Sequence, residues 1–145
     1  MAVKIAGRVR DWFKGFASLR DFGWRSLDGL GRIELGQWGE RVAERHLRRK
    51  GYRILERNFR RAAAEIDLVA MDGPTLVFVE VKTRRTETVG TPQESVNAYK
   101  QRHIRRAGEI YARSHRVQDH PMRFDVVAIV ADRRGRRLEL LKDAF

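Results

Sequence analysis

Asp67, Glu80 and Lys82 are the residues best suited by type and spacing to chemistry, because each stands in a segment that is otherwise apolar. Residues two apart on a strand share a face, so Glu80 and Lys82 project together, and Asp67 can stand opposite them on a paired strand. Buried ions are unfavourable unless they are paired or hold a metal. Two interpretations follow. One is a structural Glu80–Lys82 ion pair with Asp67 solvated at a strand end. The other is a Mg²⁺ site with ligands from Asp67 and Glu80, in which Lys82 orients a water molecule.

The segments that carry these residues are typical of a β-hairpin that enters a buried sheet. Apolar residues alternate over residues 66–70 and run almost without a break over residues 76–81. Asp72-Gly73-Pro74 lies between them and is a turn signal. The hairpin would bring two carboxylates and an ammonium group into one small space.

A helix is predicted over residues 36–50, ended by Gly51. Its apolar arc consists of Leu35, Trp38, Val42, Ala43 and Leu47. Glu40 lies about 20° from Leu47 on the helical wheel and therefore borders the core. Glu40 is either an ordinary helix-surface ion-pair partner or a third acidic group near the hairpin.

A second helix is predicted to start with Thr91 as its N-cap and Pro92 as its first residue, and to end near His115. Its apolar arc consists of Val96, Tyr99, His103, Ile104, Ala107, Ile110 and Tyr111. Lys100 falls inside this arc. Its ammonium group either extends to solvent or, with Gln101, reaches the carboxylates of the hairpin.

The remaining elements complete an α/β domain. Strands are predicted over residues 52–59, 123–130 and 136–141, with a polar, basic loop over 83–90. The long helical crossover makes the Glu80 strand parallel to the strand of residues 123–130. The sequence therefore predicts a mixed five-stranded sheet with flanking helices in the order α-β-β-β-α-β-β.

Charge indicates a polyanionic partner. The 145 residues include 31 Lys and Arg against 19 Asp and Glu, which gives a net charge of +12 and a pI near 11.1. Nucleic acid is the first expectation, and an anionic membrane surface is the second. The absence of cysteine excludes a disulfide framework and a thiolate metal site. No segment has the length and hydropathy of a membrane span, so a cytoplasmic location is expected.

Two regions are distinguished along the chain. Residues 1–33 are predicted to be a basic amphipathic extension and linker, and residues 34–145 to be the folded domain. The extension would pack on the domain or dock on a partner or membrane surface.

The domain resembles the YraN-like family of predicted endonucleases, in the PD-(D/E)XK superfamily with its restriction-endonuclease-like fold. The family is similar in layout to archaeal Holliday junction resolvases. The resemblance covers about residues 36–145 and rests on Gly39-Glu40, Arg57-Asn58-Phe59-Arg60, Glu65-Ile66-Asp67-Leu68, Phe78-Val79-Glu80-Val81-Lys82, Tyr99-Lys100-Gln101 and Arg123-Phe124-Asp125-Val126-Val127. Ala64 departs from the pattern, because the family usually has glycine before Glu-Ile-Asp.

The resemblance implies Mg²⁺- or Mn²⁺-dependent hydrolysis of nucleic-acid phosphodiester bonds. It implies a metal held by Asp67, Glu80, the Val81 carbonyl and Glu40, with Lys82 and Lys100 as further catalytic residues. The substrate would be DNA, in branched or repair-intermediate form, and a homodimer is expected by analogy. The residues expected to contact nucleic acid are Arg57, Arg60, Arg84, Arg85, Gln101 and Arg105.

Two other functions remain open at this point. The first is a nucleic-acid-binding protein that keeps the charged cluster as a structural network without catalysis. The second is a membrane- or partner-docking module that acts through the extension of residues 1–33.

Overall fold

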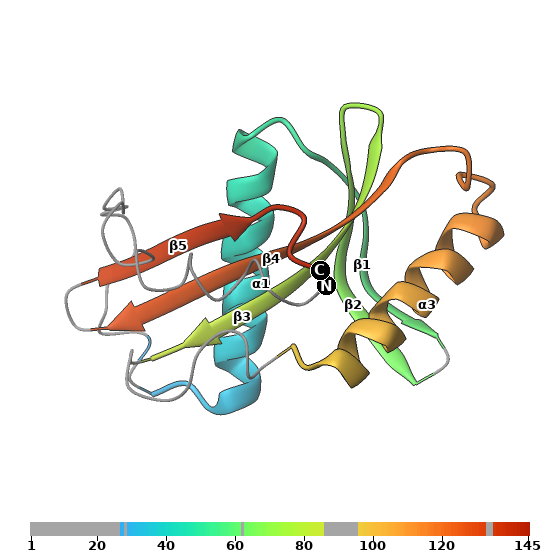
Figure 1. The fold of residues 1–145 in the computed structure, drawn as a ribbon. Helices are drawn as coiled ribbons and strands as arrows, with labels where there is room; N and C mark the ends of the chain where they lie inside the picture. Colours follow the sequence, from blue (N-terminus) through green and yellow to red (C-terminus); the bar gives the residue numbers. More distant parts are fainter. Residues whose placement is uncertain (1–26, 28, 62, 86–95, 133–134) are drawn as a thin grey trace.

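The computed structural model describes residues 27, 29–61, 63–85, 96–132 and 135–145. The elements follow the predicted order, as Figure 1 shows. They are α1 (Arg32–Arg49), β1 (Arg53–Arg61), β2 (Ala64–Asp72), β3 (Thr75–Arg84), α3 (Ala98–Ser114), β4 (Met122–Asp132) and β5 (Gly135–Leu141).

The strands form one mixed sheet in the order β1-β2-β3-β4-β5. β1 pairs with β2 and β2 with β3 in antiparallel fashion, β3 pairs with β4 in parallel, and β5 closes the edge antiparallel to β4. The parallel pair requires a crossover, and α3 supplies it between β3 and β4. The predicted mixed sheet is therefore confirmed.

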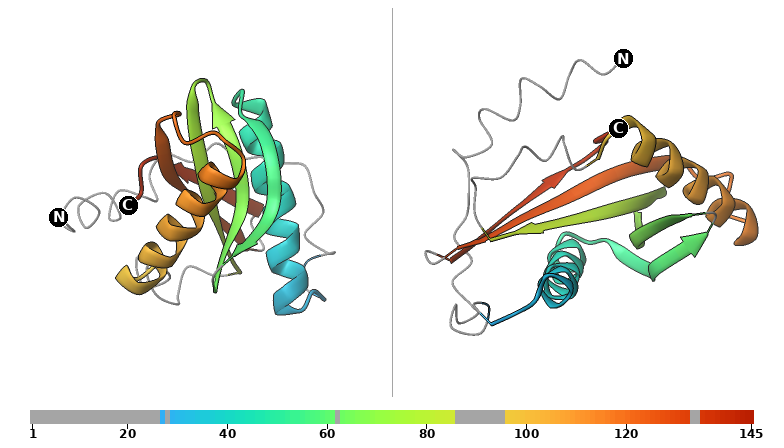
Figure 2. Two further views of the ribbon diagram at one scale, coloured as in Figure 1. Left: turned by 90° about the vertical axis from the view of Figure 1, so that its right-hand side faces the viewer. Right: turned by 90° about the horizontal axis from the view of Figure 1, so that it is seen from below.

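Among the described residues, α1 and α3 cover opposite faces of the sheet (Figure 2). On one face, the predicted apolar arc of α1 is buried and packs on residues such as Val79 of β3 and Val127 of β4. The approach is close at Gly39, where an added Cβ would lie 1.7 Å from Thr83 Oγ1. Only glycine permits α1 to lie so near β3 at this point.

Aromatic side chains dominate the opposite face, beneath α3. Tyr111 of α3 contacts Phe59 edge-on at a centroid distance of 5.0 Å and Phe78 at 5.9 Å. Gly108 lies directly above Phe78, since a Cβ there would approach the ring to 2.8 Å. α3 therefore packs tightly on the sheet, and this packing fixes the position of its first turn.

Several predicted boundaries were wrong by a few residues. α1 begins at Arg32 instead of Gly36, because Gly31 is the N-cap and its N–H donates to Glu34 at 2.6 Å. β3 continues to Arg84, into the predicted loop. Residues 1–26 of the predicted extension lie outside the described residues. The helix predicted there therefore remains a prediction.

The start of the second helix also differs from the prediction. α3 begins at Ala98, and the side chain of its N-cap Asn97 accepts a hydrogen bond from the Lys100 N–H at 2.9 Å. Thr91 and Pro92, the predicted start, lie outside the described residues.

Candidate active site

The charged residues gather where β2 and β3 separate. The paired register between these strands ends at Leu68 and Val79. Beyond that point β2 stays with β1, while β3 stays with β4, so the sheet opens into a fork (Figure 1). The Val81 N–H is satisfied instead by the side chain of Asp67, whose Oδ2 accepts it at 2.6 Å. This hydrogen bond thus holds the Asp67 side chain in the gap between the two separating strands.

Glu80 is the central carboxylate of the fork. It is only 5% exposed, and its Oε1 lies 2.6 Å from the Lys82 Nζ on the same strand. The same oxygen accepts a hydrogen bond from the Lys100 Nζ, in the first turn of α3. Of the two interpretations of Lys100 from the sequence, contact with the hairpin carboxylates is therefore the one observed, and extension to solvent is not.

Glu40 approaches the same region from α1. Burial raises the pKa of the Glu40 carboxyl group, and the nearby charges of Glu65 and Glu80 add to this, while a hydrogen bond with the Asn58 side chain lowers it. Asn58 has a left-handed backbone with φ 52°. Sequence reasoning assigned Asn58 no role, although Asn is one of the residues that adopt this conformation most readily.

The electrostatics of the fork differ from those of an ordinary ion pair. Burial and the neighbouring charge of Glu80 raise the pKa of Asp67 to about 7, against the hydrogen bond from the Val81 N–H. Burial also lowers the pKa of Lys82. Burial alone would lower the pKa of Lys100, but its hydrogen bond to Glu80 outweighs this and raises it. We call Glu40, Asp67, Glu80, Lys82 and Lys100 the fork cluster.

The donor chemistry of the fork cluster fits a hard divalent cation. Asp67 and Glu80 offer carboxylate oxygens, and three carboxylates face two ammonium groups, which leaves negative charge for a cation to neutralise. Within the described part of the chain, no group of three or more His, Cys, Asp or Glu residues is arranged to hold a metal by itself. A Mg²⁺ ion commonly keeps several waters and takes only one or two carboxylates. Asp67, Glu80 and the Val81 carbonyl would suffice for that mode, with Glu40 nearby.

Three of the arginines predicted to bind nucleic acid have partners within the protein. Arg57 donates from Nε and Nη2 to the Glu44 carboxylate at 2.7 and 2.6 Å, and Arg60 donates to Glu65 at 2.9 Å. Arg85 donates to the carbonyls of Leu27 and Leu30, which precede α1. These contacts order the side chains, and the role of the arginines on nucleic acid remains a prediction.

Two of the other three predicted contact residues, Gln101 and Arg105, are also held by contacts within the protein. Gln101 donates from Nε2 to the Val96 carbonyl at 2.9 Å. The Arg105 guanidinium stands over the Phe124 ring at 5.3 Å and the Phe145 ring at 5.7 Å. Arg84 is half-buried at the end of β3. Their role in binding likewise remains a prediction.

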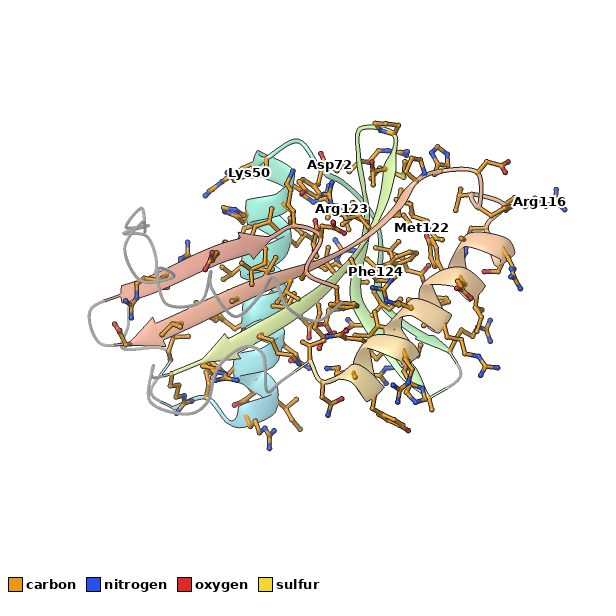
Figure 3. The ribbon with its side chains drawn as sticks, in the orientation of Figure 1. Lys50, Asp72, Arg116, Met122, Arg123 and Phe124 are labelled. Carbon is orange, nitrogen blue, oxygen red and sulfur yellow. The ribbon has the colours of Figure 1, made fainter. Side chains whose placement is uncertain are left out.

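A second charge cluster, built around the buried Asp125, lies at the opposite end of the β2–β3 ladder, and sequence reasoning missed it. Arg123 donates to both oxygens of Asp125 at 2.8 and 2.9 Å, to Asp72 at 2.8 Å and to the Tyr52 hydroxyl at 2.8 Å. Lys142 donates to Asp72 at 3.0 Å. Figure 3 shows Asp72 and Arg123 near the hairpin turn. We call Tyr52, Asp72, Arg123, Asp125 and Lys142 the hairpin-end network.

Fold and site together define a class of protein. A mixed sheet flanked by helices, with Asp67 on one strand and Glu80-Val81-Lys82 on the next, has the arrangement of the restriction-endonuclease-like α/β proteins. The family model described as "Uncharacterised protein family UPF0102" matches residues 39–129. The chain belongs to this family, which is the YraN-like family.

Curated relatives support this membership over nearly their whole length. The chain is 47% identical over 122 residues to a UPF0102 protein of Geotalea uraniireducens, which covers 83% of this chain and 96% of that protein. It is 47% identical over 116 residues to one from Moorella thermoacetica, with 79% and 97% covered. It is 46% identical over 112 residues to one from Symbiobacterium thermophilum, with 77% and 95% covered.

Neither of the described helices has the length and apolar character needed to span a membrane.

Proposed function

We propose that this protein is a metal-dependent endonuclease that hydrolyses phosphodiester bonds in DNA. The observation that carries the proposal is the fork cluster, in which Asp67, Glu80 and Lys82 converge although each stands in an apolar strand. Burial raises the pKa of Asp67 to about 7 and lowers that of Lys82, and shifted pKa values within a cluster of charged groups are typical of functional sites. The net charge of +12 supplies the attraction for a polyanion.

The residues of the fork cluster divide into two roles. Asp67, Glu80 and the Val81 carbonyl would hold Mg²⁺ or Mn²⁺, with Glu40 orienting this set. When bound, the metal would neutralise the phosphate and lower the pKa of a water molecule. Lys82 is positioned by Glu80 Oε1 at 2.6 Å, and burial lowers its pKa, so it is suited to orient the attacking water and to hold or release a proton.

Lys100 has a separate role in this proposal. Its ammonium group shares the Glu80 oxygen with Lys82. From this position at the edge of the metal-binding carboxylates, Lys100 would bind a phosphate oxygen beside the scissile bond.

The test is cleavage of labelled duplex, flap, single-stranded and four-way-junction DNA with Mg²⁺ or Mn²⁺. Glu80→Gln should reduce cleavage at least about 100-fold, because it removes one metal ligand and the partner of both lysines. Glu109→Gln, an exposed carboxylate on α3, is the control and should cleave as the wild type does. Equal cleavage by wild type and Glu80→Gln would rule out the assigned site.

A non-catalytic nucleic-acid-binding role is the second candidate, and one observation favours it. The Asp67 and Glu80 carboxylates both have hydrogen-bond partners without a metal, namely the Val81 N–H and the two ammonium groups. Binding of DNA that is unaffected by EDTA, with no cleavage of any substrate in the panel, would support this role.

A further inference from the structure

Tyr99 is exposed in a way that the helical pattern did not predict. It was expected in the apolar arc of the second helix, but it is 64% exposed, so that prediction was wrong. The wheel explains why, since Tyr99 lies about 140° from the buried Ile104. The large exposed apolar side chains of the described residues are Ile33, Leu55, Tyr99 and Met122, and Tyr99 is the aromatic one.

The Tyr99 ring has an aromatic neighbour one turn later. Its centroid lies 4.2 Å from that of His103, with the two rings inclined by 53°. Together they present an aromatic surface on the solvent side of the first two turns of α3. Exposed tyrosine rings are common at binding surfaces, because one end of the ring is apolar and the other carries a hydroxyl group.

Two cationic side chains lie beside this aromatic surface. Arg102 and Arg106 are exposed, and on the helical wheel they lie within about 60° of Tyr99. Lys100, the next residue, turns the other way and contacts Glu80 in the fork cluster. The aromatic surface is therefore one residue away from the proposed cleavage site along the helix.

We infer that Tyr99 and His103 form a stacking platform for an unpaired base of the nucleic acid that enters the fork cluster. Aromatic rings with interspersed cations bind single strands because each base has a π-face and each nucleotide a phosphate. The bases of intact duplex DNA are already stacked on one another. The platform thus favours single-stranded, flapped or otherwise unpaired DNA, a preference that rests on the proposed function.

The test measures binding without cleavage, in EDTA. A single-stranded oligonucleotide with 2-aminopurine reports stacking by quenching of its fluorescence, and anisotropy of a labelled copy reports affinity. Tyr99→Ala should weaken binding about tenfold and lose the quenching, while Tyr99→Phe and Tyr99→Trp should keep both. Met122→Ala, which removes an exposed apolar side chain at the start of β4, is the control and should bind as the wild type does.

Salt dependence separates stacking from charge. Tyr99→Ala should leave the slope of log affinity against log salt unchanged, whereas Arg102→Gln should reduce that slope by about 0.7, the value for one phosphate contact on a single strand. Equal weakening of duplex and single-stranded binding by Tyr99→Ala would overturn the inference. Loss of a protein dimer in Tyr99→Ala, seen by sedimentation, would also overturn it and would assign the ring to contact with a second copy.

These results are independent of the proposed hydrolysis. Tyr99-dependent stacking without cleavage by the wild type would support the platform and reject the nuclease. Metal-dependent cleavage by the wild type, with affinity and quenching unchanged in Tyr99→Ala, would support the nuclease and reject the platform.

Discussion

The fork cluster and the hairpin-end network lie at opposite ends of the β2–β3 ladder, and both bury carboxylates, but they balance charge differently. In the network, Asp125 is fully buried and is held by two bonds from Arg123 and one from the Asp143 N–H. The hydrogen bond from Arg123 lowers the pKa of Asp72, the usual sign of a carboxylate stabilised by its partners. In the fork, by contrast, the pKa of Asp67 is raised to about 7.

The contrast separates two uses of buried charge. The hairpin-end network joins the residue before β1, the β2–β3 turn, β4 and the C-terminal residues through hydrogen bonds and ion pairs, and the partners of Asp72 lower its pKa. In the fork cluster, burial raises the pKa values of Glu40 and Asp67, so keeping these two carboxylates ionised in the absence of a cation costs stability. Sites of that second kind are characteristic of function, because binding a ligand relieves the unfavourable charge.

The largest effect should come from breaking the hairpin-end network. Arg123→Met removes the partner of Asp125 and Asp72, and leaving a buried charge unpaired costs about 3–5 kcal/mol of unfolding free energy. Urea denaturation measures this loss. Arg60→Met, which breaks the exposed pair with Glu65, is the control and should cost less than about 1 kcal/mol. Similar losses in the two variants would contradict the distinction between the network and surface pairs.

The raised pKa of Asp67 in the fork cluster should make the stability of the protein depend on pH. The folded pKa of Asp67 is raised from 3.8 to about 7, so its contribution to stability is complete below pH 4 and is lost as the pH rises to 7. The Asp67→Asn variant has no carboxyl group at this position, so its stability does not include this loss with rising pH. Wild-type stability minus Asp67→Asn stability, measured by denaturation in EDTA, should therefore fall by roughly 4 kcal/mol from pH 4 to pH 8. A difference that is flat or that rises with pH would show that Asp67 is not held in the strained state.

Much of the fold follows from local patterns in the sequence. Alternation over residues 66–70 and the apolar run over 76–81 predicted the hairpin, and the spacing of Leu35 to Leu47 predicted the buried arc of α1. The contact of Lys100 with Glu80 was one of two interpretations of a lysine within an apolar arc, the other being extension of its ammonium group to solvent.

What sequence reasoning missed depends on distant contacts. Arg123 and Asp72 are separated by 51 residues, and nothing near either residue indicates the other. The divergence of β2 and β3 arises because each strand keeps a different neighbour, which no pattern within one strand reveals. Tyr99 was assigned to too wide an apolar arc, since it lies about 140° around the helix from the buried Ile104.

The position of α1 beside the fork can be tested at two glycines of the same helix. A Cβ at Gly39 would lie 1.7 Å from Thr83 Oγ1, so Gly39→Ala should force α1 from β3 and cost about 1–2 kcal/mol. At Gly36 nothing lies within 4 Å, and Gly36→Ala should instead stabilise the protein by up to about 1 kcal/mol through helix propensity. Opposite signs in thermal or urea unfolding confirm the close approach. If both substitutions stabilise, Gly39 is not at a crowded contact.

The smallest expected effect concerns the hydroxyl that faces Gly39. Thr83 Oγ1 is buried and has no hydrogen-bond partner among the described residues, unlike the polar groups of the hairpin-end network. Thr83→Val should therefore stabilise the protein by up to about 1 kcal/mol, because an unpaired buried hydroxyl costs free energy that a methyl group does not. Ser114→Ala is the control, since Ser114 Oγ donates to the Tyr111 carbonyl at 3.0 Å, and its loss should destabilise by about 0.5–1 kcal/mol. If Thr83→Val lowers stability, the hydroxyl has a partner such as water. A gain in stability with reduced DNA cleavage would instead place Thr83 beside the fork cluster as a residue kept for function at a cost in stability.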